Sequence, residues 1–182
     1  GDDCFVEGDP TEGALITLAL KANLKPALEH ESLPRIDTIP FESQHRFMAT
    51  LHQMHTGTCI ALIKGAPEKI LSMCSREGDW YNHRPLIAHH WQQTIQELAM
   101  SGQRVLAIAV KKTNAQQTTL EAEAELGDFT ILGLVGISDP PREEAIKAVS
   151  LCRSAGIQVK MITGDHAATA QAIGLQLGIG DG

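Results

Sequence analysis

The chain has 182 residues and a formal net charge of −7, with 43% hydrophobic and 20% charged residues. This composition is typical of a folded globular protein rather than a disordered one, and the acidic balance argues against nucleic acid as the main partner. No stretch approaches the ~18 consecutive apolar residues of a membrane-spanning helix, and the acidic start does not resemble a signal peptide, so we expect this chain itself to lie outside a membrane.

The first part of the chain predicts a helix and then a hairpin. Asp9 as N-cap, with Pro10 and Glu12 behind it, begins a helical pattern that extends to about residue 23. A polar stretch marked by three prolines follows. Alternating apolar residues then predict a β-hairpin of residues 45–53 and 58–64.

The middle of the chain predicts two helices and a central strand. A short helix is expected at 68–74 and a longer one at 89–101, which ends at Gly102. Residues 76–85 are turn-rich, and residues 114–127 are polar and loop-like, with a helical piece around the glutamates as the alternative. The nearly continuous apolar run 105–110 predicts a strand buried on both faces.

The last part of the chain has the pattern of a parallel strand-helix-strand-helix unit. An apolar run at 129–137 predicts a strand, and Asp139 is expected to cap a helix that ends at Gly156. A second strand is expected at 157–163, followed by a helix at 166–177. We place a domain change near residues 133–138.

Two turns of this unit contain candidate residues for binding a phosphate or phosphoryl group. Asp139-Pro140-Pro141-Arg142 and Thr163-Gly164-Asp165 each follow a predicted strand, and ligands of parallel sheets bind outside the carboxyl ends of the strands. A guanidinium matches phosphate oxygens, and a hydroxyl with a backbone N–H at a helix start can hold a phosphoryl group. An N-cap with a solvated first-turn arginine is the simpler alternative for the first turn.

A lysine lies at the end of the hairpin, where Lys64-Gly65-Ala66-Pro67 joins a strand to a helix. Gly65 allows a ligand to approach the backbone closely, and the following helix N-terminus attracts anions. Lys64 can therefore meet a phosphate or lie along a base. A plain strand-to-helix turn explains the same tetrad equally well.

Three further residues have two interpretations each. Phe41 can stack on a flat ring such as adenine, although a core aromatic is the simpler explanation. Glu12 can accept a hydrogen bond from an adenine amino group, or it can complete a capping box. Arg104 is a candidate phosphate or ribose contact, or an ordinary surface arginine.

The histidines and cysteines do not form a convincing metal site. The four cysteines are scattered without a Cys-x-x-Cys pair, which favours reduced thiols in a cytoplasmic setting. His52 and His55 are expected on opposite sides of a hairpin strand. His89 and His90 are neighbours on a helix, so their side chains diverge. Solvated surface histidines are the preferred interpretation.

Read in order, five short motifs resemble the cytoplasmic ATP-binding region of the P-type cation-pumping ATPases, in particular the calcium-pump-like and related bacterial pumps. The motifs are Gly8-Asp9-Pro10-Thr11-Glu12-Gly13-Ala14-Leu15, Pro40-Phe41, Lys64-Gly65-Ala66-Pro67, Asp139-Pro140-Pro141-Arg142 and Thr163-Gly164-Asp165. The resemblance implies an α+β nucleotide-binding domain at 1–133, with an antiparallel sheet flanked by helices. It implies a partial α/β Rossmann-like, haloacid-dehalogenase-type fragment of the phosphorylation domain at 134–182.

The resemblance also implies roles for these residues. Phe41 would stack on adenine, with Glu12, Lys64 and Gly65 lining the base pocket. Arg104 and Arg142 would approach the phosphates. The remaining phosphoryl-site residues would be Thr163, Gly164, Asp165 and Asp139. ATP and Mg²⁺ are the implied cofactors, and the implied partners are the remaining phosphorylation, actuator and membrane domains of a pump, on the cytoplasmic side of a cell membrane.

The chain departs from the family pattern in two places. It contains neither the Asp-Lys-Thr-Gly-Thr motif that supplies the nucleophilic aspartate nor the later Gly-Asp-Gly-x-Asn-Asp motif. We therefore expect a piece of a larger protein that binds ATP without turning it over. Because two strands alone bury little core, we also expect residues 134–182 to be loosely held or paired with another copy.

Two alternatives from other classes stay open. A soluble haloacid-dehalogenase-type phosphohydrolase also suits the Thr163-Gly164-Asp165 turn, but it needs a nucleophilic aspartate after an early strand. A non-catalytic nucleotide-sensing module would be complete without one. Continuation of the natural reading frame on both sides of this sequence would argue against the nucleotide-sensing module.

Overall fold

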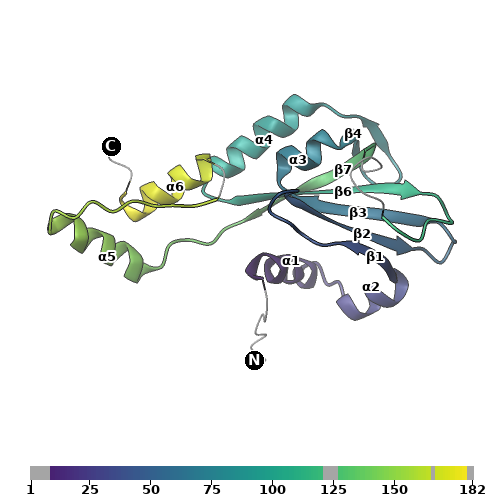
Figure 1. Ribbon diagram of the computed structural model, residues 1–182, viewed down its shortest axis with the longest axis horizontal. Coiled ribbons are helices and arrows are strands. Elements are labelled where there is room, and N and C mark those ends of the chain that lie inside the picture. The colour runs from purple at the N-terminus through teal and green to yellow at the C-terminus, as the bar shows by residue number, and fades with distance from the viewer. Residues whose placement is uncertain (1–8, 121–126, 165–166, 180–182) are drawn as a thin grey trace. The chain divides into compact units, whose positions relative to one another are not determined.

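The computed structural model describes residues 9–120, 127–164 and 167–179, which divide into two compact units (Figure 1). The first unit contains the described residues up to Leu86 together with Ile108–Gly133. The second contains Ile87–Ala107 and the described residues from Leu134 onward. Strands β6 (Arg104–Thr113) and β7 (Phe129–Ile137) each run from one unit into the other.

One seven-stranded sheet, in the order β1-β2-β3-β6-β7-β4-β5, organises the first unit. Its other strands are β1 (Arg35–Ile39), β2 (Phe47–Gln53), β3 (Cys59–Gly65), β4 (Cys74–Gly78) and β5 (His83–Pro85). The pairs β1–β2, β2–β3 and β4–β5 are antiparallel, whereas β4 and β7 are parallel. The expected purely antiparallel sheet is therefore wrong, and the α+β class is confirmed.

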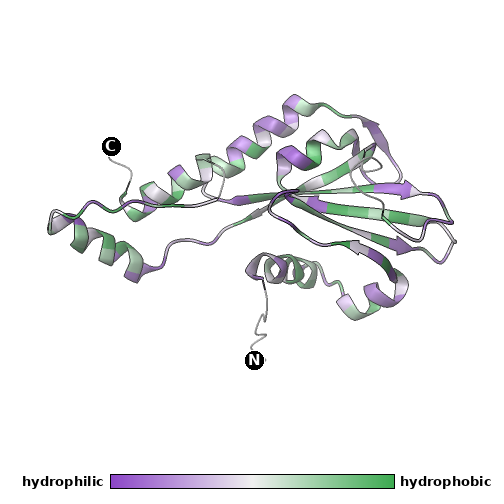
Figure 2. Ribbon diagram, viewed as in Figure 1, coloured by the Kyte–Doolittle hydropathy of each residue, from purple (hydrophilic) through white to green (hydrophobic). Residues whose placement is uncertain are grey.

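The β2–β3 hairpin forms as the alternating sequence predicts. Phe47 pairs with Gly65 and Gln53 with Cys59, and the turn between the strands contains Gly57 with φ 82°. Every second side chain of the two strands points into the core, including the fully buried Phe47 and Ile63. These strands are among the most apolar segments of the first unit (Figure 2).

Helices lie on both faces of this sheet in the first unit. Helix α3 (Pro67–Ser72) packs against β3 and buries Ile70 and Leu71. Helices α1 (Pro10–Lys21) and α2 (Pro26–Ser32) lie on the opposite side of the strands (Figure 1). The predicted start of α1 is confirmed, since the side chain of Asp9 accepts a hydrogen bond from the Thr11 N–H at 2.7 Å.

Three helices form most of the second unit: α4 (Ala88–Met100), α5 (Glu143–Ser154) and α6 (Ala167–Leu177). Helix α6 packs against both α4 and α5. Gly102, Gly156 and Gly178 follow the three helices with φ between 75° and 80°. The three glycine helix ends that the sequence predicts are thus confirmed.

Two predictions for the second unit are wrong. Residues 157–163 form no strand, because no described strand lies beside them to complete the hydrogen-bond ladder. The expected parallel strand-helix-strand unit is therefore not formed among the described residues. Asp139 does not cap α5, whose N-cap is Arg142. The consecutive prolines explain the late start, because a residue that precedes proline is held in extended conformations.

Three further differences concern the first unit. The proline-marked stretch contains α2 and β1, which the sequence pattern does not predict, and the turn-rich segment 76–85 contains most of the β4–β5 hairpin. Both strands of that hairpin are short, and they are the last two strands at one end of the sheet. Their sequences have no strong apolar pattern, so the strands are recognised from their hydrogen-bonded pairing and not from the sequence. Cys74 belongs to β4 and not to the preceding helix.

Candidate functional site

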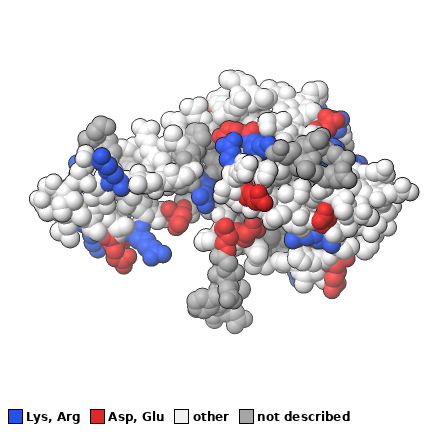
Figure 3. Space-filling model, in the orientation of Figure 1, with Lys and Arg blue, Asp and Glu red and all other residues white. Residues whose placement is uncertain are grey.

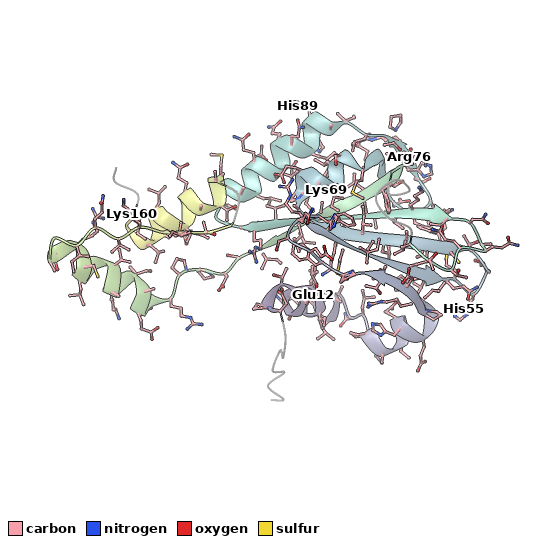
Figure 4. All side chains as sticks on the ribbon, viewed as in Figure 1. Glu12, His55, Lys69, Arg76, His89 and Lys160 are labelled. Atoms are coloured by element: carbon pink, nitrogen blue, oxygen red, sulfur yellow. The ribbon has the colours of Figure 1, made fainter. Side chains whose placement is uncertain are left out.

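The most informative side-chain contact joins Glu12 of α1 to Lys64 of β3. The Lys64 Nζ donates to Glu12 Oε1, and the two side chains are 21% and 53% exposed, respectively. Figure 4 labels Glu12 on α1. Two residues predicted from separate motifs thus meet at one place.

The backbone beside this ion pair is closely packed. A Cβ atom added to Gly65 would lie 2.4 Å from the carbonyl oxygen of Arg46 and 2.7 Å from the Cα of Phe47. The Arg46 carbonyl also accepts a hydrogen bond from the Ala66 N–H at 2.9 Å. Only glycine fits at position 65, because the neighbouring strand occupies the space of any side chain.

Phe41 is at the same end of the hairpin. It lies in the connection between β1 and β2, and β2 begins opposite the end of β3, where Phe47 pairs with Gly65. Its side chain is 59% exposed. The alternative of a core aromatic is therefore excluded, and the exposed ring is available for stacking.

Arg46 is a residue that the sequence analysis missed. It follows a turn in which its N–H donates to the Glu42 carbonyl at 2.8 Å, and it has φ 59°, which is uncommon for a residue other than glycine. Its backbone contacts the Gly65–Ala66 segment directly. In the sequence, only the position of Arg46 five residues after Phe41 points to it. That position becomes informative once the strand register is known, because the register pairs the neighbouring Phe47 with Gly65.

The remaining described candidates lie in the second unit. Arg104 begins β6, and Asp139 and Arg142 precede and cap α5. Thr163 and Gly164 are exposed in the segment ahead of α6, and the predicted Asp165 lies outside the described residues. Each unit therefore carries its own set of predicted residues: Glu12, Phe41, Lys64 and Gly65 in the first, and Arg104, Asp139, Arg142, Thr163 and Gly164 in the second.

Hydrogen bonds lower the pKa of three carboxyl groups, those of Asp37, Asp79 and Asp128. The N–H groups of Leu120 and Thr38 lower the pKa of Asp37, and those of Asn82 and Tyr81 lower the pKa of Asp79. A hydrogen bond from the Ser75 side chain, with the nearby Arg76 charge, lowers the pKa of Asp128. These carboxylates hold turns and loop connections together, so a structural role accounts for their lowered pKa values and no catalytic role is needed.

A cavity in the first unit lies apart from the predicted residues. It is lined by the β4–β5 hairpin and by parts of β6 and β7, where the Lys112 ammonium lies 4.8 Å from the centre of the Trp80 ring. Arg76 and Asp128 at its wall are 4.0 Å apart. Basic and acidic side chains are likewise intermixed over the visible surface (Figure 3).

No group of three or more histidine, cysteine or carboxylate side chains suited to a metal ion occurs in the described part of the chain. His52 instead bonds to the Leu33 carbonyl and to the Thr50 hydroxyl, each at 2.9 Å. Among the described helices, none combines the length and the apolar character that crossing a membrane requires.

Comparison with known proteins gives a consistent result. Residues 2–144 match the family model described as P-type ATPase, cytoplasmic domain N. The chain is 43% identical to the cation-transporting ATPase pma1 of Synechocystis sp., over 100% of this chain and 20% of that protein. It is 41% identical to the probable cation-transporting ATPase F of Mycobacterium bovis, over 97% of this chain and 19% of that protein.

A calcium-transporting ATPase of Bacillus subtilis is 35% identical, over 94% of this chain and 20% of that protein. The chain thus spans about a fifth of the length of these relatives.

Proposed function

This chain belongs to the family of P-type ATPases, and we propose that it binds ATP as the nucleotide-binding part of a cation-transporting member. The observation that carries the proposal is the meeting of Glu12 and Lys64 next to Gly65, at the end of the sheet where Phe41 is exposed. An adenine needs a flat apolar surface and a small number of polar partners, and these residues supply both.

Each residue of this set has a separate task. The Phe41 ring stacks on the adenine, since 59% of it is open to a ligand. Glu12 accepts a hydrogen bond from the adenine amino group, and Lys64 lies along the base. Gly65 lets the end of β3 pack directly against the Arg46–Phe47 backbone, and this packing fixes the position of the adjacent Lys64.

A second group of residues is proposed for the phosphate groups of ATP. Arg104 and Arg142 contact phosphate oxygens through their guanidinium groups. Thr163, Gly164 and Asp165 hold the transferred phosphoryl group, with support from Asp139. Mg²⁺ arrives bound to the phosphates, which agrees with its preference for substrate oxygens and retained waters over a cage made only of protein.

In the longer protein we propose that ATP hydrolysis proceeds through an aspartyl-phosphate and drives cation transport. In this arrangement residues 1–133 are the nucleotide-binding domain and residues 134–182 a part of the phosphorylation domain, on the cytoplasmic side of the membrane. The phosphorylation, actuator and membrane domains complete the pump. This chain contains no Asp-Lys-Thr-Gly-Thr word, so by itself it binds ATP and does not hydrolyse it.

The test is a calorimetric or NMR titration of the 182-residue chain with ATP, ADP, AMP and GTP, with and without Mg²⁺. Saturable binding that prefers adenine over guanine is expected. Lys64→Ala and Phe41→Ala are each expected to weaken it, by about 1–3 kcal/mol for the loss of the stacking ring. Absence of binding into the millimolar range, or equal binding of GTP, would contradict the proposal.

A further inference from the structure

The turn between α4 and β6 is held from several sides within the second unit. The Gln103 N–H donates to the Leu98 carbonyl of α4 at 3.3 Å. The Gln103 carbonyl accepts a hydrogen bond from the Thr169 hydroxyl of α6 at 3.1 Å. Thr169 is only 2% exposed, and a buried hydroxyl of this kind is costly to leave without its partner.

The side chain of Gln103 lies against a third element. A Cβ atom added to Gly136 of β7 would lie 2.0 Å from Gln103 Oε1 and 2.9 Å from its Cδ. The Gln103 side chain therefore occupies the space that a side chain at position 136 would need. Gly102, with φ 80°, allows the turn, and its missing side chain leaves room for Gln176 of α6 at 3.2 Å.

These contacts, from Gln103, Thr169 and Gly136, connect the three segments that carry the proposed phosphate contacts. Gln103 directly precedes Arg104, and Gly136 lies three residues before Asp139. Thr169 belongs to α6, the helix that follows Thr163 and Gly164.

The segment ahead of α6 is attached to the same helix. A Cβ atom on Gly174 would lie 3.8 Å from the terminal carbon of Met161, which is ordinary contact distance. Met161 lies two residues before Thr163, so the turn with Thr163 and Gly164 is linked through α6 to the Gln103 backbone. No strand supports residues 157–163 in the described chain, which makes this helix contact more important for their placement.

We propose that Gln103 is a positioning residue, which with Thr169 and Gly136 holds Arg104 in register with Thr163 and Gly164 for the phosphate end of the nucleotide. The inference rests on the proposed ATP binding. It gives Gln103 no contact with ATP itself. Binding requires pre-placed groups, because ordering them at the moment of binding lowers the affinity.

The experiment compares the affinities for ATP and AMP, since AMP shares the adenine, ribose and α-phosphate but lacks the outer phosphates. In the 182-residue chain, Thr169→Val removes the hydrogen bond to the Gln103 carbonyl and is expected to weaken ATP binding about three- to tenfold. Gln103→Ala removes the side chain that packs against Gly136 and is expected to weaken ATP binding as well. AMP affinity is expected to stay unchanged. Thr169→Ser keeps the hydroxyl and is therefore expected to bind ATP with the affinity of the wild-type chain. Gln96→Ala, an exposed glutamine of α4, is the matched control.

A further variant tests the same contact from the other side. Gly136→Ala is expected to displace the flexible end of Gln103 and to reduce ATP binding selectively. In the Gln103→Ala background, Gly136→Ala is expected to have no added effect on ATP binding, because the glutamine side chain that the new methyl group would displace is absent. Equal losses for ATP and AMP, or unchanged ATP binding in folded variants, would overturn the positioning role. If the wild-type chain binds no adenine nucleotide, the proposed function is wrong and this inference falls with it.

Discussion

Lys64 on β3 and Glu12 on α1 form an ion pair between segments 52 residues apart in the chain. The pair brings together two residues that were predicted from separate motifs. Exposed and half-exposed ion pairs contribute only about 0–1 kcal/mol to stability. The more important consequence of this contact is therefore expected in ligand binding rather than in folding.

Substitution of this pair separates the two roles. Lys64→Gln is expected to weaken ATP binding while it changes the free energy of unfolding by less than about 1 kcal/mol. Calorimetric titration and urea denaturation measure the two quantities. Lys147→Gln removes the exposed Lys147–Glu143 pair of α5 and is the control. A loss of affinity that simply follows a loss of stability would show that Lys64 is structural.

Phe41→Ala is expected to affect binding and not folding. Because the ring is 59% exposed, its removal should change the free energy of unfolding by no more than about 0.5 kcal/mol. The loss of a stacked base should cost about 1–3 kcal/mol of affinity. Tyr81→Ala is the matched control, since Tyr81 is 82% exposed on the β4–β5 turn. Similar effects of the two substitutions on ATP affinity would refute a specific role for Phe41.

Gly65→Ala is expected to destabilise the protein by about 1–3 kcal/mol, the usual cost of inserting a methyl group into filled space. The atoms in its way are backbone atoms of Arg46 and Phe47, which cannot rotate away. Gly133→Ala on β7 is the control, because no atom lies within 4 Å of its added Cβ. Thermal and urea unfolding of both variants measures the difference. Equal stabilities would mean that the strands at position 65 adjust freely.

Asp37 makes part of the stability depend on pH. Its carboxylate accepts hydrogen bonds from the Leu120 and Thr38 N–H groups at 2.7 and 2.8 Å, which lowers its pKa below the ordinary value of 3.8. The stabilisation is therefore present above that ordinary value and is lost as the pH falls through the lower pKa of the folded state.

Asp37→Asn is thus expected to lower the melting temperature at pH 7, with a difference from the wild-type chain that shrinks below about pH 4. Melting curves between pH 2 and about pH 7 measure it. A difference that stays constant over this range would show that the charge of Asp37 has no part in the effect.

The thiol of Cys74 is expected to react slowly. Burial raises its pKa to about 12, so at about pH 8 almost none of it is the reactive thiolate. Iodoacetamide should label Cys74 slowly in the native chain and rapidly in urea, and peptide mapping by mass spectrometry identifies the site. Fast labelling of the native chain would show that β4 opens readily.

Several elements follow from local sequence patterns. The Asp9-Pro10 start of α1, the hairpin around Gly57 and the glycine ends of α4, α5 and α6 were predicted from residues close together in the chain. In contrast, the failure of residues 157–163 to form a strand depends on the neighbour that a strand needs. The cap pattern at Asp139 does not start α5, because the two prolines that follow hold the backbone extended up to Arg142.

The sequence by itself determined the family, the period of the main strands and helices, and the residue types of the candidate site. Only the tertiary structure decided the strand order, the parallel pairing of β4 with β7, the exposure of Phe41 and the meeting of Glu12 with Lys64. The physical reason is that helix starts and turns depend on hydrogen bonds between near neighbours. Strand pairing and side-chain burial depend instead on segments far apart in the chain, whose alignment no local pattern specifies.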